Sequence, residues 1–278
     1  MLQEVRTSTG PITRVHADRR EREADYVMPS HHCHPYYELS YIEKGACRFL
    51  VEDGMYDLVE GDFLLIPPQT IHYTRYLLGA CRRCGVYFRM EDLDDEIVSR
   101  LPGGTEFFSQ MCILKTPSDA RRRIGELIAA MGDEELRPDE SSPLLLRRQL
   151  QGLLLLCARS CTLERRGPAE IRTADRQVLL AARFINEHFR QQITAADIAA
   201  AAGFSPNYLS RKFREAAGIG VHDYLVFVRL REAALELVTT RESVTEIALR
   251  CGFSDSNYFK DAFKKKYGMT PREYRREH

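Results

Sequence analysis

The first ninety residues alternate short apolar runs with turns, which is the pattern of β-strands joined by tight connections. Glycine-containing turns at 43–45, 52–54 and 60–62 separate the runs at a spacing of about ten residues. Short strands with regularly spaced turns are typical of a small barrel or sandwich. The predicted strands cover residues 36–42, 46–51, 55–59, 62–66 and 83–88.

Beyond residue 90 the spacing of apolar residues changes to the period of helices. One helix is predicted over 118–131 and a second over 141–161, where Ser141-Ser142-Pro143 supplies a cap and a first-turn proline. The second helix has more leucine than one packing face needs, and two explanations stay open: burial against a second subunit, or packing against this chain's own strands. The apolar positions are Ile124, Leu127, Ile128 and Met131 in the first helix, and Leu144, Leu145, Leu146, Leu150, Leu153, Leu154, Leu155, Leu156, Cys157 and Cys161 in the second.

The chain divides at a polar stretch in its middle. Residues 164–173, which include Arg165-Arg166-Gly167-Pro168, have the composition of a linker, and the chain beyond them has the pattern of helices separated by glycine turns. We therefore predict an α+β protein with one domain over 1–163, a linker over 164–173 and an all-helical domain over 174–278.

An internal repeat marks the helical domain. Ile198-Ala199 and Gly203-Phe204-Ser205 recur as Ile247-Ala248 and Gly252-Phe253-Ser254 at an offset of 49, and later matches continue at an offset of 50. In each unit the glycine is expected to end a first helix in the left-handed conformation, and Ser205 or Ser254 to cap a second helix. The later matches pair Asn207-Tyr208-Leu209 with Asn257-Tyr258-Phe259, Phe213 with Phe263, and Gly218 with Gly268.

The doubled pattern predicts two helix-turn-helix units. In each unit an apolar i, i+4 pair faces inward and the opposite face of the second helix is polar. Two unrelated helix pairs with solvated polar faces are the alternative, and the doubling of the whole pattern argues against it. A long apolar helix over 221–238 joins the units, and its length of ~27 Å is close to the separation of ~34 Å between successive major-groove segments on one DNA face.

These segments resemble the AraC/XylS family of transcription regulators over roughly residues 175–277. The matching stretches run from Ile198 to Phe213, from Tyr224 to Ala233, and from Ile247 to Tyr274. The resemblance implies that the second helix of each unit reads base edges in the major groove, with Arg211 as the expected guanine contact. The implied base contacts are Asn207, Ser210, Arg211, Ser256, Asn257, Lys260 and Asp261, and the implied phosphate contacts are Lys212, Arg214, Lys264, Lys265 and Lys266.

Asp261 departs from the basic or small polar residue that is often found at its position. An acid near phosphate is unfavourable unless it accepts a hydrogen bond from a cytosine amino group or pairs with Lys264 or Lys265. This residue therefore has two candidate roles.

Histidines gather in the N-terminal domain in a pattern that resembles the two cupin motifs. The first is His32-Cys-His34-Pro-Tyr-Tyr-Glu38 with a trailing Gly45, and the second runs from Gly61 through Pro67 to His72, with Gln69 where a glycine is usual. The resemblance implies a cupin-like β-barrel in which His32, His34, Glu38 and His72 converge on a divalent metal. Residues two apart on a strand point to the same side, and imidazoles with one carboxylate suit Zn, Fe, Mn or Ni.

Two other uses of this histidine motif stay open. In regulatory cupins attached to this type of DNA-binding domain, the motif is often barrel structure around a pocket for an organic effector, of which a sugar is the common class. Cys81-Arg-Arg-Cys84 has the CxxC spacing, but a single CxxC is weak evidence for zinc. Packed or reactive thiols are the favoured interpretation of these two cysteines.

Charge separates the two domains, although the whole chain has 40 basic and 40 acidic residues. Residues 1–171 carry a net charge of −5 and residues 172–278 a net charge of +5, which favours nucleic-acid contact by the second part. No apolar run is long enough for a membrane span, and the start lacks the pattern of a secretory signal. We therefore expect a cytoplasmic protein with reduced cysteines.

Together these observations predict a non-enzymatic, sequence-specific transcription regulator. The expected partners are double-stranded DNA, a small-molecule effector and a second copy of the chain, with RNA polymerase as a further candidate. Helices 118–131 and 141–161 are the expected dimer contact. The alternatives are a metal- or thiol-responsive regulator, and a metallo-cupin enzyme with an appended DNA-binding domain. The effector, the operator and the choice between activation and repression do not follow from the sequence.

Overall fold

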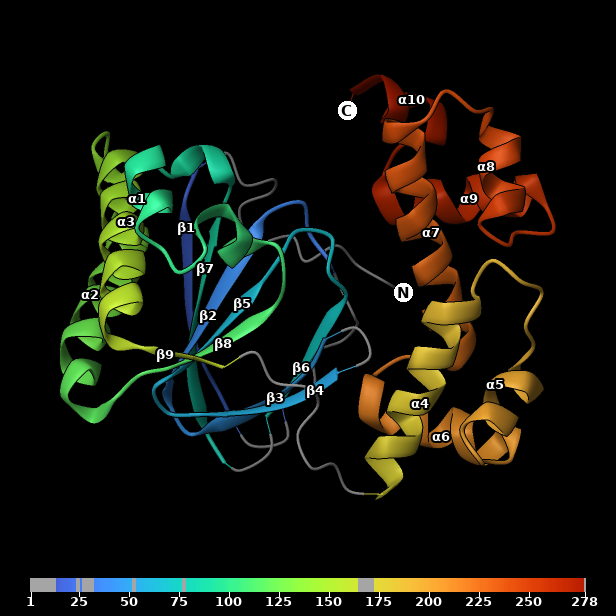
Figure 1. Cartoon of the computed structure of the whole chain (residues 1–278), viewed down its shortest axis with the longest axis horizontal. Coiled ribbons are helices and arrows are strands. Elements are labelled where there is room, and N and C mark those ends of the chain that lie inside the picture. Colours follow the sequence, from blue (N-terminus) through green and yellow to red (C-terminus); the bar gives the residue numbers. More distant parts are fainter. Residues whose placement is uncertain are drawn as a thin grey trace.

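The N-terminal part of the chain holds two β-sheets that face each other (Figure 1). The computed structural model describes residues 14–23, 26, 33–51, 54–76, 79–164 and 173–277. The larger sheet has the order β1 (His16–Arg22), β7 (Cys81–Phe88), β2 (Tyr37–Lys44), β5 (Asp62–Ile66), β8 (Cys112–Lys115) and β9 (Thr162–Glu164), and the smaller one β4 (Gly54–Val59), β3 (Ala46–Val51) and β6 (His72–Tyr76). The pairings within both sheets are antiparallel.

Strand β2 shows how the alternation of side chains creates two cores. Leu39 and Tyr41 pack in a core that the larger sheet shares with helices, whereas Ile42 packs in a second core between the sheets. Glu38 and Ser40 have the parity of Ile42 and are fully buried. The alternation of β2 therefore directs polar side chains into the space between the sheets, where the candidate sensor site lies.

Two long helices cover the outer face of the larger sheet (Figure 1). Helix α2 (Ser118–Leu136) extends five residues beyond its predicted end, and α3 (Ser142–Ser160) lies within its predicted range. Leu144 and Leu145, at the start of α3, are 59 % and 44 % exposed, so these two leucines do not pack on the chain's own strands. Short helices η1 (Met90–Asp92), α1 (Asp95–Ser99) and η2 (Gly104–Phe108) precede β8.

Within the described residues the five predicted strands are present, together with four for which no range was predicted: β1, β6, β8 and β9. Strand β1 is an edge strand whose Arg19, Arg20 and Glu21 are exposed, so its sequence lacks the apolar alternation on which the prediction depended. Strand β9 occupies residues 162–164, and it therefore takes up the first residue of the predicted linker.

The C-terminal part is entirely helical in its described residues and contains the predicted pair of helix-turn-helix units. After α4 (Thr173–His188), α5 (Ala195–Ala201) and α6 (Pro206–Ala217) form the first unit, and α8 (Val244–Arg250) and α9 (Ser256–Tyr267) form the second. Helix α7 (Val221–Thr239) joins them, as predicted, and α10 (Pro271–Glu277) follows. None of the helices in the described ranges is long and apolar enough to cross a membrane.

The capping residues explain where the helices of the two units begin. Thr194 and Ser243 form matching capping boxes with the acid three residues later. Ser205 caps α6, as predicted, but the prediction that Ser254 caps α9 is wrong. Asp255 takes that role, with its carboxylate 2.8 Å from the Asn257 amide, because the extra residue in the second repeat moves the start of α9 along by one.

The second unit is fixed to the end of α4 at Gly252, whose φ is +86°. The Gly252 carbonyl accepts a hydrogen bond from Gln192 Nε2 at 3.0 Å. Arg229 of α7 donates from Nε to the Phe189 carbonyl at 2.8 Å and from Nη2 to the Gln191 carbonyl at 2.7 Å. These contacts connect α4, α7 and the turn of the second unit, so α7 is not the sole link between the two units.

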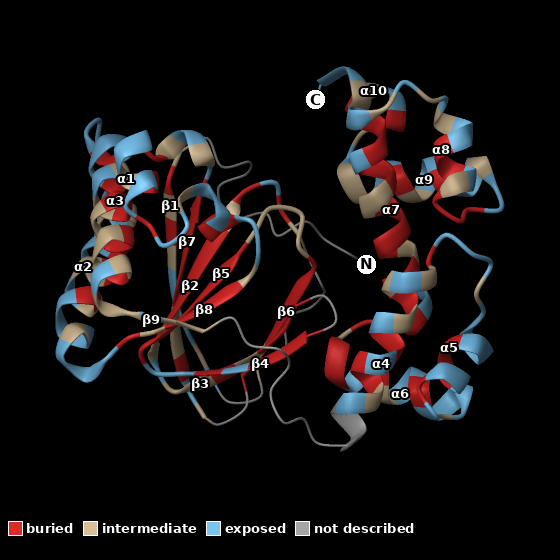
Figure 2. Cartoon of the chain, viewed as in Figure 1, coloured by how far each residue is buried: buried red, intermediate tan, exposed pale blue. Residues whose placement is uncertain are grey.

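The outer face of the smaller sheet packs against the first helix-turn-helix unit (Figure 2). Leu50, Met55 and Ile71 are buried in one core with residues of α4, α5, α6 and α7. Tyr73 of β6 lies over Gly218, the C-cap of α6, so closely that an added Cβ at Gly218 would lie 2.5 Å from its ring. The two domains are therefore in direct contact.

Candidate DNA-binding surface and sensor site

Helix α6 presents its predicted polar face to solvent. Leu209 and Phe213, one turn apart, are buried in the domain core and orient the helix. The side chains opposite them are exposed: Asn207, Ser210, Arg211 and Arg214. With Glu215 they line an open depression of about 440 Å³ on the surface of the unit.

Glu215 is a member of this face that the sequence analysis did not identify. Its carboxylate accepts from Arg211 at 3.0 Å and from Lys212 at 2.8 Å, and the hydrogen bond from Lys212 lowers the pKa of Glu215. The Arg211 guanidinium also lies 5.0 Å from the centre of the Tyr208 ring. The expected base-reading arginine is thus paired with an acid four residues along the same helix.

Helix α9, like α6, exposes most of the side chains that were predicted to contact DNA. Asn257, Lys260, Asp261, Lys264 and Lys265 are exposed, and Ser256 is half-buried. The structure places Lys266 differently from the prediction.

The ammonium of Lys266 is directed into the domain rather than towards solvent. It lies 3.2 Å from the centre of the Phe227 ring, and its Nζ is buried. The prediction that Lys266 contacts phosphate therefore does not fit this geometry. The third of three consecutive lysines on a helix lies about 200° around the axis from the first, so it has left the face that the first one occupies.

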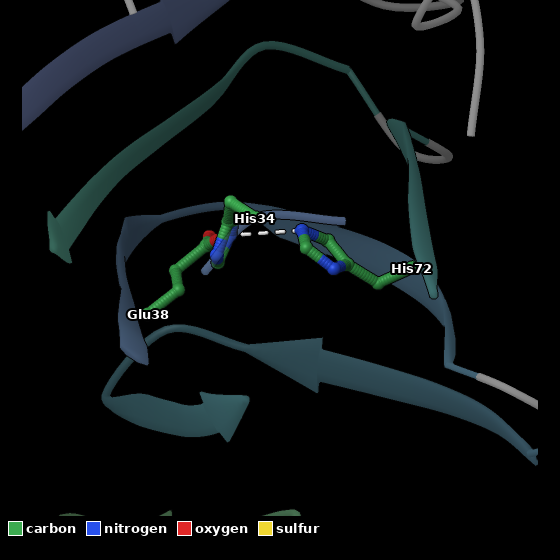
Figure 3. A group of neighbouring side chains, drawn as sticks. All are labelled: His34, Glu38 and His72. Carbon is green, nitrogen blue, oxygen red and sulfur yellow. Dashed lines mark hydrogen bonds and ion pairs between the residues drawn. The ribbon is translucent and has the colours of Figure 1, made fainter. Parts of the chain in front are cut away.

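Three residues of the histidine motif converge in the space between the two sheets (Figure 3). His34 Nε2 lies 3.2 Å and His72 Nε2 3.1 Å from the same oxygen, Glu38 Oε2. Glu38 comes from β2 and His72 from the start of β6, and all three residues are buried. His34 precedes β2, so the expectation that it lies on a regular strand is wrong. His32 lies outside the described residues.

The hydrogen bonds of the two imidazoles define what the site can bind. Nδ1 of His34 lies 2.8 Å from the Tyr36 carbonyl and Nδ1 of His72 lies 3.0 Å from the Thr70 carbonyl. A carbonyl only accepts, so each Nδ1 carries the proton. Each Nε2 then faces Glu38 Oε2 in one of two ways: as a donor when the imidazole is charged, or as a lone pair that can bind a metal cation when the imidazole is neutral.

Charge in this cluster is set by burial and hydrogen bonding together. Burial alone would raise the pKa of Glu38, but its hydrogen bonds with His34 and His72 and the charge of Arg83 hold that pKa well below its usual range. Burial lowers the pKa of His34. Glu38 is therefore an ionised carboxylate beside two imidazoles, of which burial favours the neutral form of His34.

Arg83 is a second functional candidate that the sequence analysis missed. Its Nη1 lies 3.5 Å from Glu38 Oε1 and 3.3 Å from Thr74 Oγ1, and its guanidinium faces the Phe49 ring at 5.5 Å. Ser40 donates to the same Glu38 oxygen at 2.6 Å. Arg83 lies between the two cysteines of the CxxC motif. Side chains on a strand alternate between its two faces, and this alternation along β7 could have predicted that Arg83 points into the barrel.

The CxxC cysteines do not form a pair. Cys81 packs between the sheets beside Cys47, whereas Cys84 packs on the opposite face of β7 with the helices. An odd separation along a strand places two side chains on opposite faces. The interpretation of Cys84 as a packed thiol fits this position.

Family models match both parts of the chain. An AraC-like ligand binding domain matches residues 18–154, and a helix-turn-helix domain matches residues 198–277. The chain is 35 % identical over 227 residues to the uncharacterized HTH-type transcriptional regulator YijO of Escherichia coli, a match that spans 80 % of this chain and 75 % of the relative. It is 27 % identical over 254 residues to the HTH-type transcriptional activator RhaS of Klebsiella pneumoniae, across 90 % and 88 % of the two chains.

Other relatives are longer. The chain spans 31 % of the length of an uncharacterized HTH-type transcriptional regulator from Staphylococcus aureus, with 26 % identity over 242 residues. Among solved structures, the C-terminal domain of AraT, a response regulator from Geobacillus stearothermophilus, aligns with 37 % of this chain and 85 % of its own, at 37 % identity and a TM-score of 0.36.

Proposed function

Because the chain belongs to the AraC family of transcriptional regulators, with a ligand-binding and a DNA-binding domain, we propose that it is an effector-responsive regulator that reads a specific DNA sequence with α6 and α9. The single observation that carries this proposal is the doubled, capped helix-turn-helix unit with an exposed polar face on each second helix. The relatives named above are transcriptional regulators, in agreement with the expectation of a non-enzymatic protein.

The base contacts can be separated from the phosphate contacts by experiment. We expect Arg211→Ala to weaken binding to the operator by about 1–3 kcal/mol and to relax specificity at one base pair, since a bidentate guanine contact has this value. Lys265→Ala is the matched control, expected to weaken binding to all sequences alike and to reduce the salt dependence by about one counterion. Gel shifts against the DNA upstream of the chain's own gene measure both effects. An Arg211→Ala variant with unchanged sequence preference would contradict the assignment.

The effector is proposed to bind between the two sheets. Charged and hydroxyl groups converge there, the Tyr36 and Tyr87 rings contact the His34 ring, and Tyr76 lies in the core between the sheets. Glu38 and Arg83 offer an acceptor and a donor to a polar ligand. A small polyhydroxylated molecule such as a sugar suits this combination of hydrogen-bonding groups and aromatic rings. A thermal-shift screen with sugars tests this class, and stabilisation by apolar ligands alone would contradict it.

Strand β6 supplies a direct route from this site to the DNA-binding surface. His72, Thr74 and Tyr76 have the inward parity, whereas Tyr73 and Arg75 point to the other domain. Arg75 Nη1 donates to the Glu215 carbonyl of α6 at 2.5 Å. A ligand that displaces β6 would therefore move the C-terminal end of α6. Effector binding and DNA binding would then be coupled, each changing the free energy of the other.

A metal ion is the second candidate for the sensor site. It is favoured by one observation: the ligand atoms of His34, Glu38 and His72 lie within 4.8 Å of one another. These two imidazoles and one carboxylate fit Zn, Fe, Mn or Ni, and a bound metal would supply a fixed charge for an effector to coordinate. Arg83 is a competing cation beside the same carboxylate.

Metal content of the purified chain tests this candidate. We expect about one equivalent of bound metal in the wild type if the site holds one, and loss of that equivalent in His72→Ala because the substitution removes one of the protein ligands. His222→Ala is the control, since His222 is exposed on α7 in the other domain. Metal-free wild-type protein that still responds to an organic effector would contradict the metal role.

A homodimer is the proposed assembly, with RNA polymerase as a further proposed partner. The leucines exposed where α2 ends and α3 begins, Leu136, Leu144 and Leu145, support a contact between copies at this end of the helix pair. Sedimentation velocity measures this state.

A further inference from the structure

The thiols that lie together in this fold are not those of the CxxC motif. Cys157 and Cys161 are one helical turn apart at the end of α3, and Cys161 is the C-cap of that helix. This spacing places their side chains on the same face of the helix, and Thr116 Oγ1 lies 3.5 Å from Cys161 Sγ. Cys157 is buried, whereas Cys161 is partly exposed.

This arrangement divides the two cysteines into an attacking and a resolving thiol. Hydrogen bonds from Cys157 and Thr116 lower the pKa of Cys161 to about 7, although its partial burial opposes this shift. The pKa of Cys157 is raised by its hydrogen bond with Cys161 and by burial. A partly exposed sulfur with thiolate character beside a second thiol is the arrangement found in redox-sensing cysteines.

We propose that Cys157 and Cys161 are an oxidisable thiol pair, a modification site that makes the regulator responsive to peroxides. The Cys161 thiolate attacks one peroxide oxygen, the O–O bond breaks, and a sulfenic acid forms with loss of hydroxide, which takes up the proton that the Cys161 thiol released and becomes water. The Cys157 thiol then attacks the Cys161 sulfur, a second water leaves and the disulfide forms. Two thiols are oxidised by one peroxide, which is reduced to two waters.

Closing this bridge changes the end of the sensor domain. Side chains four apart on a helix have Cβ atoms about 5–6 Å apart, whereas a disulfide needs about 3.5–4.5 Å. The last turn of α3 must therefore tighten or unwind. Strand β9 begins at the next residue, Thr162, and pairs with Lys115 of β8 before the chain continues to α4. A strained bridge is also easily reduced, as a reversible switch requires.

Mass spectrometry tests the site independently of DNA binding. The full chain, reduced and then treated with hydrogen peroxide, is expected to lose two hydrogens per chain. Trypsin cleaves after Arg159, between the two cysteines, so the bridge appears as peptide 149–159 joined to peptide 160–165. Cys161→Ser and Cys157→Ala are expected to abolish the joined peptides, and Cys33→Ser to retain them. Cys33 is the matched control because it is partly exposed but donates to Gln69 Oε1.

The effect on DNA affinity rests on the proposed function and is measured separately. Oxidation is expected to change the operator Kd of the wild type by about fivefold or more, in the range of allosteric couplings, and a thiol reductant is expected to restore it. Both cysteine variants should be insensitive to peroxide while binding DNA as the reduced wild type does. Absence of the joined peptides overturns the thiol pair. Joined peptides with an unchanged Kd overturn the regulatory role and leave the DNA-binding function intact.

Discussion

Replacing Gly252 by alanine is expected to destabilise the DNA-binding domain by about 2–6 kcal/mol and to abolish operator binding near the growth temperature. Two effects add at this position. Its φ of +86° is strained for a residue with a side chain, which costs about 1–3 kcal/mol. An added Cβ would also lie 2.4 Å from the Phe189 carbonyl oxygen, and relieving such overpacking costs a further 1–3 kcal/mol or so.

The structure offers little room for relief of this clash. The Phe189 carbonyl is held by Arg229 Nε at 2.8 Å, and the Gly252 carbonyl by Gln192 at 3.0 Å. Movement of the turn would break hydrogen bonds of the buried Arg229 guanidinium. Thermal unfolding of the full chain, followed by the loss of helical circular dichroism, measures the change.

Gly203 provides the matched control because it holds the same place in the first unit. Its φ is +69°, but the nearest atom to an added Cβ is the flexible end of Gln177, at 3.7 Å. Gly203→Ala is therefore expected to show the conformational strain alone, about 1–3 kcal/mol. Equal destabilisation by the two substitutions would show that the close contact between residue 252 and the Phe189 carbonyl contributes nothing.

The repeat made the DNA-binding domain the most predictable part of the molecule. A glycine, a capping residue and an i, i+4 apolar pair are local signals, and each of them depends on neighbouring residues in the chain. The errors were local as well: an inserted residue moved the cap from Ser254 to Asp255, and helical rotation turned Lys266 inward.

The sensor domain was predictable in outline but not in its contacts. His34, Glu38 and His72 were identified from a motif, and the structure brings these three together. Arg83 was missed because its contact with Glu38 depends on the pairing of strands that are distant in sequence. The pair Cys157 and Cys161 was missed because the sequence analysis considered only the CxxC spacing of Cys81 and Cys84. Long-range register decides which side chains meet inside a barrel, and a single sequence does not specify it.

Among substitutions in the sensor domain, Glu38→Ala is expected to lower the free energy of unfolding the most. Glu38 is fully buried and bonds to His34, His72 and Ser40, with Arg83 as its ionic partner. Its removal leaves the Arg83 guanidinium, whose side chain is 14 % exposed, without a carboxylate. Breaking a buried ion pair by removing one partner costs about 3–5 kcal/mol, a large share of the stability of a domain.

Chemical denaturation in the presence of a chelator measures this loss without interference from bound metal. Glu21→Ala is the surface control: Glu21 pairs with Arg82, the neighbour of Arg83 on β7, at 2.8 Å, and both side chains are exposed to solvent. That variant is expected to behave as the wild type because exposed pairs contribute little.

A third variant distinguishes charge from shape at this position. Glu38→Gln keeps an acceptor for Ser40 but removes the charge, so it should lose much of the same stability. The double variant Glu38→Gln/Arg83→Met should recover part of it, because the buried guanidinium no longer needs a partner. If Glu38→Ala were as stable as the wild type, then Arg83 would have to reach water, and the space between the sheets would be open to solvent rather than a closed polar core. The stability recovered in the double variant therefore separates two roles of Glu38. If Glu38 serves the fold only by neutralising Arg83, it becomes dispensable for stability once the arginine is removed.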